Sequence, residues 1–392
     1  MKEKKFFLQF LFFFTTLLFL PRSADFIFSF NSSTQKQSYN PSKDSLRFTG
    51  ETHLRNIRQL TFGGNNAEAY WSFDNKQLIF QSDWKEINQQ PCDQIFKMNA
   101  DGSPLENGKQ YMLLSTGKGR TTCSYFLNNE QIIFASTHQA DEKCPESKMF
   151  AAGRYVWPLY KSYDIYIADK NGSNPKVLIG GEGYDAEATV SPDGKYVVFT
   201  SNRSGDLDLW RYEIKTGKLL QLTNTLGYDG GAFFSRDSKH IVWRASRPQV
   251  EKSDTYKKLL ADGFVEPKEL NIYMADIDGK NVKQVTNLPG ANWAPFFHPD
   301  GKRILFCSNH HSLDKGGRIF DIFMINTDGT GLEKITNSGI FDAFPMFSFD
   351  GKKIAFSSNR NVDGKISHDT NVFVADWIDK PNEVDLNFKS LK

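Results

Sequence analysis

Short apolar runs recur along the chain after residue 50, and residues typical of turns separate them. One stretch, from Ala186 to Asn202, reads AEATVSPDGK followed by YVVFTSN. Runs of this length that are rich in Val, Phe and Tyr and end at turn residues predict β-strands. Asp-Gly supplies the positive φ that a tight hairpin turn requires. The stretch therefore predicts two antiparallel strands joined by a turn.

The same two-strand stretch occurs in six copies, whose first strands read AEAYWSFDNK, RTTCSYFLNNE, AEATVSPDGK, GGAFFSRDSK, WAPFFHPDGK and AFPMFSFDGK. Each copy continues with a third strand, such as DLWRYE, that alternates polar and apolar residues as half-buried strands do. A returning fourth strand, such as LEKITN, follows in five of the copies. Four antiparallel strands form one blade of a β-propeller, and a blade must pack against other blades to bury both of its faces.

The sixth copy ends at VFVADWIDKP without a fourth strand, whereas NIRQLTFGG, from Asn56 to Gly64, resembles the fourth strands. We predict that this N-terminal strand completes the last blade, which covers sheet edges and couples the two ends of the chain. The predicted fold class is an all-β, six-bladed β-propeller of four-stranded antiparallel blades over residues 50–380. Residues 25–49 are expected to form a linker and residues 381–392 a C-terminal tail.

The N-terminus differs in composition from the rest of the chain. Lys2, Lys4 and Lys5 precede an apolar run from Phe6 to Leu20. A basic start followed by such a run predicts a secretory signal peptide over residues 1–24. The run is short for a transmembrane helix, which needs about 20 residues. We therefore expect a periplasmic or secreted protein that contacts the membrane only through this segment, if the segment is not cleaved and stays as an anchor.

The net charge bears on nucleic-acid binding, and the cysteines bear on disulfides and zinc. The net charge is +2, and basic residues are scattered among acidic ones, which gives no electrostatic case for nucleic acid. An exported chain permits disulfides, and we predict one bridge among Cys92, Cys123 and Cys144, with the pairing left open. No pair of cysteines at CxxC spacing indicates zinc.

The longest insertions all join a second strand to a third strand. They run from Phe134 to Asp164 and from Trp243 to Asn271. In a propeller these loops share one face, here called the long-loop face, with the loops that enter each first strand. Loops of this length are uncommon in compact domains unless they are functional or disordered. We predict that the long-loop face carries the function; the alternative is that the insertions only brace neighbouring blades.

Polar residues recur at the entry to each first strand on that face: Asn66, Arg120, Asp185, Asp229, Asn292 and Asp342. Glu68, Thr122 and Glu187 come just inside them, and the second strands end at Asp83, His138, Arg203, Arg247, His310 and Arg360. A ring of acids and bases at the channel mouth could bind a polar ligand, a peptide terminus or a metal ion. Alternatively, each side chain could bond to local backbone or bridge two blades.

His138, His310 and His311 are the only candidate metal cluster in the sequence. A six-fold ring places His138 and His310 in blades two and five, far apart, so we predict neither a metal site nor a cofactor. The third strands begin with a further polar set, for which we predict structural, blade-to-blade hydrogen bonds. These residues are Asp93, Asp164, Asp208, Asn271, Asp321 and Asn371.

The stretch SPDGKYVVFTSNRSGDLDLW, from Ser191 to Trp210, resembles the WD-like propeller repeat of the TolB and tricorn families. The resemblance covers nearly all of the chain after residue 50. It implies a propeller that serves as a binding platform, as a regulatory cap on a peptidase or, less often, as a lyase that binds a metal through channel histidines. The expected linker is too short for the additional N-terminal α/β domain of TolB.

No G-x-S-x-G elbow, Walker loop or dinucleotide fingerprint occurs, so we predict no catalytic residue. Catalysis would have to rest on Glu68 or Glu187. We expect a non-catalytic, monomeric, exported propeller that recognises a protein, peptide or envelope polymer through the long-loop face and channel mouth. The alternatives are a metal-assisted polysaccharide lyase or hydrolase acting in the channel, and a regulatory propeller for a separately encoded peptidase.

Overall fold

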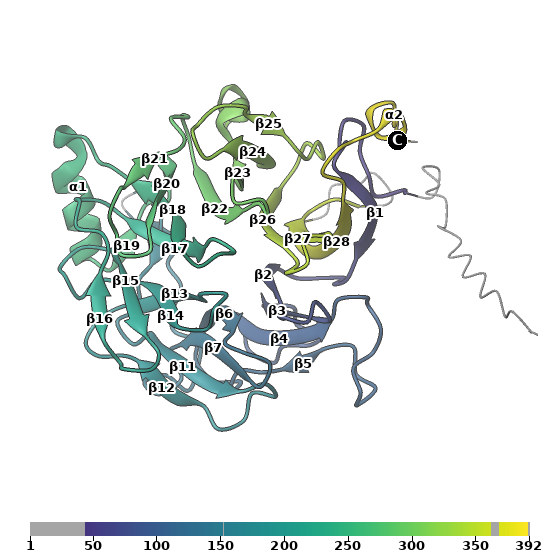
Figure 1. Ribbon diagram of the computed structural model, residues 1–392. Helices are drawn as coiled ribbons and strands as arrows, with labels where there is room; N and C mark the ends of the chain where they lie inside the picture. The colour runs from purple at the N-terminus through teal and green to yellow at the C-terminus, as the bar shows by residue number, and fades with distance from the viewer. Residues whose placement is uncertain (1–43, 152, 362–367, 391–392) are drawn as a thin grey trace, which may run out of the picture. The chain divides into compact units, whose positions relative to one another are not determined.

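The computed structural model describes residues 44–151, 153–361 and 368–390. Six four-stranded antiparallel sheets are arranged around a central axis (Figure 1), which confirms the six-bladed propeller. The expected signal peptide or anchor at residues 1–24 lies outside the described residues. No helix within the described ranges is both long and apolar enough to cross a membrane.

Five blades use their strands in chain order from the channel outwards, and the sixth takes its outer strand from the N-terminus. The innermost strands are β2 (Asn66–Trp71), β6 (Thr121–Phe126), β13 (Asp185–Val190), β17 (Asp229–Phe234), β22 (Asn292–Phe297) and β26 (Asp342–Phe347). The second strands are β3 (Gln77–Ser82), β7 (Gln131–Ser136), β14 (Tyr196–Ser201), β18 (His240–Ser246), β23 (Arg303–Ser308) and β27 (Lys353–Ser358). The third strands are β4 (Gln94–Asn99), β11 (Asp164–Asp169), β15 (Asp208–Glu213), β20 (Leu270–Asp276), β24 (Asp321–Asn326) and β28 (Asn371–Trp377). The outer strands are β5 (Met112–Leu113), β12 (Lys176–Ile179), β16 (Leu219–Gln221), β21 (Lys283–Gln284), β25 (Glu333–Lys334) and β1 (Leu54–Gln59).

The ring closes through the N-terminal strand, as predicted. Strand β1 pairs antiparallel with β28, from Leu54 opposite Trp377 to Gln59 opposite Phe373 (Figure 1). Segments on both sides of this pair pack against the last blade. The Arg360 side chain is fully buried there between Glu51 and Asp342. In the short helix α2 (Glu383–Leu386), Asp385 pairs with Arg55 at 2.6 Å.

The core lies between neighbouring blades. The second strands are buried along almost their whole length, because both of their faces pack against adjacent blades. Their near-continuous apolar sequences fit this two-sided burial. The predicted half-burial of the third strands holds for β11 and β20. It is wrong for β4, β24 and β28, each of which is buried at every residue except one.

The polar residues that begin the third strands bond mostly within their own blade, which corrects the predicted blade-to-blade bonds. Thr61, Thr223 and Thr286 follow the outer strands, and their hydroxyls donate to Asn371, Asp208 and Asn271 at 3.0, 3.0 and 2.9 Å. In the sixth, third and fourth blades these hydroxyls therefore fix the outer strand to the third strand. In the first blade Gln94, rather than Asp93, begins the third strand and accepts from the Ser115 hydroxyl at 2.7 Å. Asp93 precedes the strand and pairs with Arg120 of the next blade at 3.0 Å.

Every innermost strand carries a β-bulge at its third residue. That residue has a positive φ in all six blades, from 47° at Cys123 to 60° at Gly231, and the pairing register shifts at the same place. The bulge twists the strand and turns its third residue toward the axis. These residues form a ring that we call the neck: Glu68, Cys123, Glu187, Gly231, Ala294 and Phe344.

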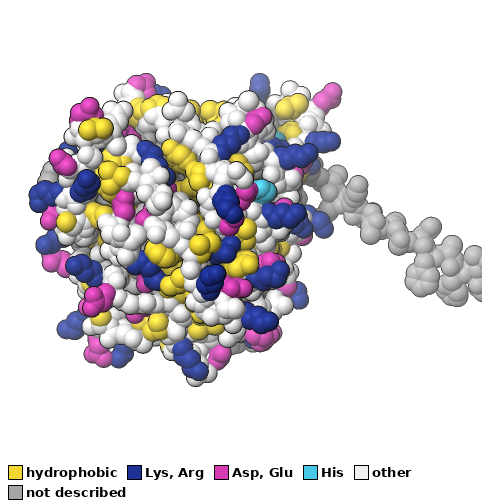
Figure 2. Space-filling view, turned by 60° about the vertical axis from the view of Figure 1, so that its left-hand side comes forward, with side chains coloured by type: hydrophobic (Ala, Val, Ile, Leu, Met, Phe, Trp, Pro, Cys, Tyr) yellow, Lys and Arg dark blue, Asp and Glu magenta, His cyan; other side chains and the backbone are white. Residues whose placement is uncertain are grey.

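The described surface carries mixed charge. Basic and acidic side chains are interspersed over the face in Figure 2, with small apolar patches between them. A disulfide joins Cys92, in the loop between β3 and β4, to Cys144, in the insertion of the second blade. Cys123 and Cys307 are free. The bridge therefore links the first two blades on the long-loop face.

Candidate functional site

A cavity of about 480 Å³ opens on the long-loop face above the neck. Aromatic side chains contribute much of its wall: Tyr155, Trp157, Tyr160, Tyr163, Tyr184, Trp293, Phe341 and Phe344. Three neck residues, Glu68, Cys123 and Glu187, line its base together with Arg244. The cavity therefore combines aromatic walls with a polar floor.

The two long insertions meet to form a roof over part of this cavity. Strand β10 (Trp157–Pro158), from the second blade, pairs with β19 (Phe264–Val265), from the fourth. Trp157 packs edge-on against Trp293, with ring centroids 6.1 Å apart, and the guanidinium of Arg244 lies 5.3 Å from its ring. The roof is thus held in place by contacts from three different blades.

The insertion of the fourth blade also braces its neighbour. It contains helix α1 (Val250–Ala261), whose Tyr256 is buried and donates a hydrogen bond to Asp206 of the third blade. The insertion therefore supports the ring as well as the roof.

Aromatic side chains close the channel below the neck. Tyr70 packs against Tyr125 and Phe233 at 5.4 and 5.8 Å, and Phe233 packs against Phe296 at 5.3 Å. A separate apolar pocket lies on the far side of this cluster, with Tyr125 and Phe296 in its wall. The cavity is therefore blind, and a ligand would enter from the long-loop face.

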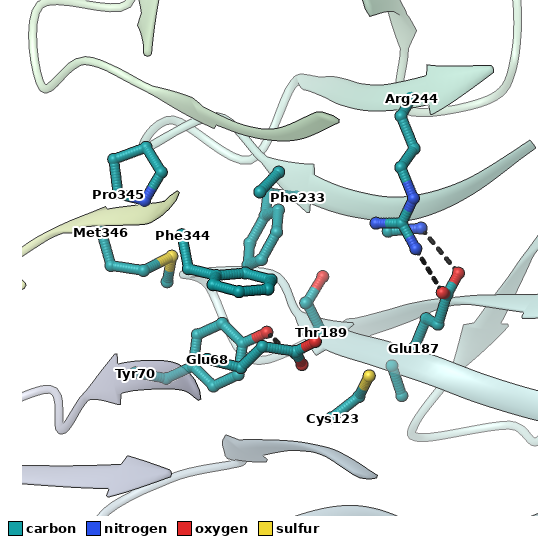
Figure 3. Close-up of a pocket in the computed structure, with 13 residues that line it drawn as sticks. Glu68, Tyr70, Cys123, Glu187, Thr189, Phe233, Arg244, Phe344, Pro345 and Met346 are labelled. Atoms are coloured by element: carbon teal, nitrogen blue, oxygen red, sulfur yellow. Dashed lines mark hydrogen bonds and ion pairs between the residues drawn. The ribbon is translucent and has the colours of Figure 1, made fainter. Parts of the chain in front are cut away.

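One side of the neck is a buried ion pair. Glu187 accepts hydrogen bonds from the Thr200 hydroxyl at 2.7 Å, the Tyr228 hydroxyl at 2.7 Å and the Gly231 backbone N–H at 2.9 Å, and it pairs with Arg244 (Figure 3). These four donors occupy the Glu187 carboxylate and connect the third blade to the fourth at the neck. The carboxylate is poorly placed to act as a base.

The carboxylate of Glu68 lies across the neck from this pair. It accepts a hydrogen bond from the Tyr70 hydroxyl at 3.0 Å, and the Cys123 thiol lies beside it (Figure 3). Burial raises the pKa of Glu68, and its interactions with Tyr70 and Cys123 only partly oppose that effect. Burial also raises the pKa of the Cys123 thiol. Among the described residues, no Lys, Arg or His forms an ion pair with Glu68.

Three of the acids expected at the channel mouth pair with the base at the end of their own second strand. Arg203 contacts both carboxylate oxygens of Asp185 at 2.7 and 2.8 Å. Arg247 lies 2.7 Å from Asp229. Arg360 lies 3.0 Å from Asp342. The three acids are buried, and burial raises the pKa of Asp229 to about 6 against the effect of Arg247. These three carboxylates therefore form ion pairs inside the protein and do not face the cavity as free ligands.

The remaining mouth residues also have local partners. The amide groups of Asn66 and Asn292 are fully buried, donate to backbone carbonyls, and accept from Ser82 and Ser308 at 2.8 and 2.5 Å. His138 bonds to Ser136 at 2.9 Å, and His310 bonds to Ser308 at 2.8 Å. Burial lowers the pKa of both histidines. Among the described residues, no three His, Cys, Asp or Glu side chains are grouped closely enough to hold a metal ion.

Arg120 does not occupy the position expected from the sequence alignment. In the second blade Thr121, opposite Ser136, takes the place that Asp185, opposite Ser201, takes in the third. Arg120 therefore precedes the strand and reaches Asp93. The same shift puts Cys123, rather than Thr122, into the neck. The turn of the second blade, Leu-Asn-Asn-Glu, lacks the Asp that the other five copies share at the third turn position, which leaves the alignment of this copy less constrained.

Arg244 was not expected from the sequence, because it lies in the middle of a second strand. The signal that could have found it is the pair Gly230 and Gly231, since the other copies have at least one larger side chain here. A Cβ on Gly231 would overlap the Arg244 guanidinium, and a Cβ on Gly230 would overlap Glu187 and Tyr228. The two glycines thus leave the space that the ion pair fills.

Replacing Gly231 with alanine is therefore expected to displace Arg244 and destabilise the protein by about 1–3 kcal/mol. Gly194→Ala is the matched control, because its φ of 69° resembles the 60° of Gly231 but no atom lies within 4 Å of the added Cβ. The difference between the two variants in urea unfolding isolates the clash from the backbone strain. Equal losses of stability would contradict the assigned packing.

Residues 257–369 match the family model described as a TolB beta propeller domain. The Tol-Pal system protein TolB of Francisella tularensis subsp. holarctica is 28% identical over 189 residues, which cover 41% of this chain and 43% of that protein. The Protein TolB homolog of Chlorobium chlorochromatii is 29% identical over 147 residues, covering 38% of this chain and 29% of that protein. The chain thus matches less than half of the length of either relative.

Among solved structures, a putative TolB from Agrobacterium tumefaciens aligns with 82% of this chain and 97% of its own, at 16% identity and a TM-score of 0.47. An oligogalacturonate lyase from Vibrio parahaemolyticus aligns with 83% of this chain and 94% of its own, at 12% identity and a TM-score of 0.46. The sequence matches confirm the expected resemblance to TolB propellers.

Proposed function

We propose that this TolB-like propeller is an exported, non-catalytic binding protein that takes an extended segment of a partner protein into the cavity of the long-loop face. The roofed, aromatic cavity carries this proposal. Its volume of about 480 Å³ lies in the range typical of ligand pockets. Aromatic residues are also enriched at the centres of protein interfaces, where they contribute most of the binding energy.

The rim of the cavity supports a macromolecular partner. A small hairpin of β8 (Phe150–Ala151) and β9 (Arg154–Tyr155) projects from the insertion of the second blade. Met149, Phe150 and Tyr155 on it are 51%, 71% and 44% exposed. Large apolar side chains gathered at the edge of a cavity are typical of protein interaction sites. The export part of the proposal rests on the N-terminal sequence pattern.

Site-specific photo-crosslinking tests the proposal. A benzophenone amino acid in place of Tyr155 is expected to give one or a few discrete adducts with partner proteins in the envelope of producing cells. Shortening the roof between residues 144 and 160 should abolish the adducts, because the partner would lose both the hairpin and Trp157. The measurement is the pattern of cross-linked bands, followed by identification of the cross-linked segment.

Val282 is the control position. It is 52% exposed and lies in the turn between β20 and β21, on the opposite face of the ring. The benzophenone at this position should give no such adducts. Equal adducts at both positions, or none at Tyr155 in a folded protein, would contradict binding at the long-loop face.

A further inference from the structure

The neck holds two carboxylates, and the Arg244 guanidinium forms its ion pair with that of Glu187. The hydrogen-bond partner of Glu68 is the Tyr70 hydroxyl, with the Cys123 thiol beside it. Higher in the cavity wall, Asp93 is paired with Arg120 at 3.0 Å, and Asp83 accepts from the backbone N–H of Asn65 at 2.7 Å. An unpaired carboxylate in a partly enclosed site favours a cation more strongly than one exposed to bulk water does.

Aromatic rings surround the approach to this carboxylate. Phe344, Trp293 and Trp157 line the same cavity as Glu68. A cation–π contact already forms in this wall, since the Arg244 guanidinium lies 5.3 Å from the ring of Trp157. A cluster of aromatic faces around a carboxylate is suited to an ammonium or guanidinium group, because the ring quadrupole attracts positive charge.

The geometry also restricts how such a group arrives. The Tyr70 and Phe233 cluster closes the channel directly below Glu68, so a chain cannot pass through the ring. A protruding side chain or a chain terminus can reach the neck from above. Glu68 thus lies at the inner end of a blind cavity.

We propose that the neck is a specificity subsite for one cationic group of the bound peptide, the side chain of Lys or Arg or a free amino terminus, which pairs with Glu68. This inference rests on the proposed function, because it assigns a chemistry to the peptide that the cavity takes. The bound cation replaces the missing partner of Glu68, and the aromatic wall encloses the aliphatic part of the side chain.

Titrations of the full-length protein with short synthetic peptides test this subsite. The probes are acetyl-Ala-Ala-Lys-Ala-Ala-amide, the same peptide with norleucine in place of Lys, and penta-alanine amide with a free amino terminus. Ligand-detected NMR suits their weak affinities. We expect the lysine peptide to bind about ten-fold tighter than the norleucine peptide. The third probe distinguishes recognition of a terminus from recognition of a side chain.

Glu68→Gln keeps the shape of the side chain and removes its charge, so it should abolish the preference for lysine. Glu251→Gln, on the exposed surface of α1, is the matched control and should retain it. Thermal unfolding of each variant establishes that it is folded. Because the comparison of lysine with norleucine is made on the wild-type protein, the test does not depend on the Glu68 variant.

The outcomes separate the two proposals. Equal binding of the lysine and norleucine peptides would overturn the cation subsite and leave peptide binding in place. Lack of binding by all three probes, together with absence of cross-links at Tyr155, would overturn both. An unchanged lysine preference in Glu68→Gln would place the cation elsewhere and overturn the role of Glu68.

Discussion

Replacing Arg360 with methionine is expected to lower the free energy of unfolding by about 3–5 kcal/mol, because it leaves buried charge without a partner. The Arg360 side chain is completely buried and donates to Glu51 at 3.0 and 3.2 Å and to Asp342 at 3.0 Å. Without the guanidinium, two carboxylates face each other inside the last blade. Chemical unfolding followed by tryptophan fluorescence measures the loss.

Arg203→Met is the matched control for this prediction. Arg203 lies two residues after the second strand of the third blade, as Arg360 does in the sixth, and it also pairs with the acid that begins the first strand. Its side chain is 22% exposed and has no second carboxylate partner. Water can therefore solvate Asp185 in the variant, and the expected loss is about 1–2 kcal/mol. Equal losses in the two variants would contradict a special role for the Glu51 contact.

The loss of unfolding free energy in Arg360→Met, relative to the wild type, should become smaller as the pH falls from about 7 toward 5. Burial already raises the pKa of Glu51 above its usual value, and Arg360 is the strongest opposing influence. Removing Arg360 raises that pKa further in the folded state only. The folded variant then binds a proton more readily than the unfolded chain does, so its stability rises as the pH falls. A deficit that does not change over this range would contradict the assignment.

Loss of the disulfide between Cys92 and Cys144 is expected to have the second large effect. The bridge closes a loop over a sequence separation of 52, for which the chain-entropy relation predicts about 4 kcal/mol. Cys92→Ala combined with Cys144→Ala should lower the unfolding free energy by about 2–4 kcal/mol. The double variant should also be cut faster by proteases between residues 144 and 156, because the bridge fixes the start of that insertion.

Reduction of the wild-type protein provides an independent route to the same state. A reductant should lower the stability of the wild type to about that of the double variant and leave the double variant unchanged. Urea unfolding with and without the reductant measures both effects. Identical curves for the reduced and oxidised wild type would contradict a stabilising bridge.

The propeller could be predicted from the sequence because its determinants are local and repeated. Alternating strands and Asp-Gly turns recur in nearly every blade, and the strand from Asn56 to Gly64 resembles the fourth strands so closely that ring closure was predictable. The turn between the first and second strands is also held by hydrogen bonds among neighbouring residues. For example, the Ser191 hydroxyl bonds to Asp193 at 2.7 Å and accepts from the Tyr196 N–H at 2.9 Å.

The candidate site was predictable only in part. Glu68 and Glu187 were identified from their position in the first strands, but their different environments depend on Arg244, which arrives from another blade. The pairing of β10 with β19 joins two insertions that share no sequence signal. Long-range contacts of this kind leave no periodic pattern in the chain.

The Asp–Arg pairs illustrate a signal that was present but misinterpreted. In blades three, four and six, the acid that begins the first strand occurs together with an arginine after the second strand. Blades one and five have asparagine at the first position and no arginine at the second. This association within the repeat indicates that the acid and the arginine pair with each other. It does not indicate that they bind a common ligand.

Ring closure through β1 also sets the order in which the protein can be completed during synthesis. Leu54 pairs with Trp377, so the ribosome must translate almost the whole ring before the partner of β1 exists. At about 5–20 residues per second, the nascent chain carries this open edge for tens of seconds. During that interval β1 is the unpaired strand to which a chaperone, or a second nascent chain, could bind.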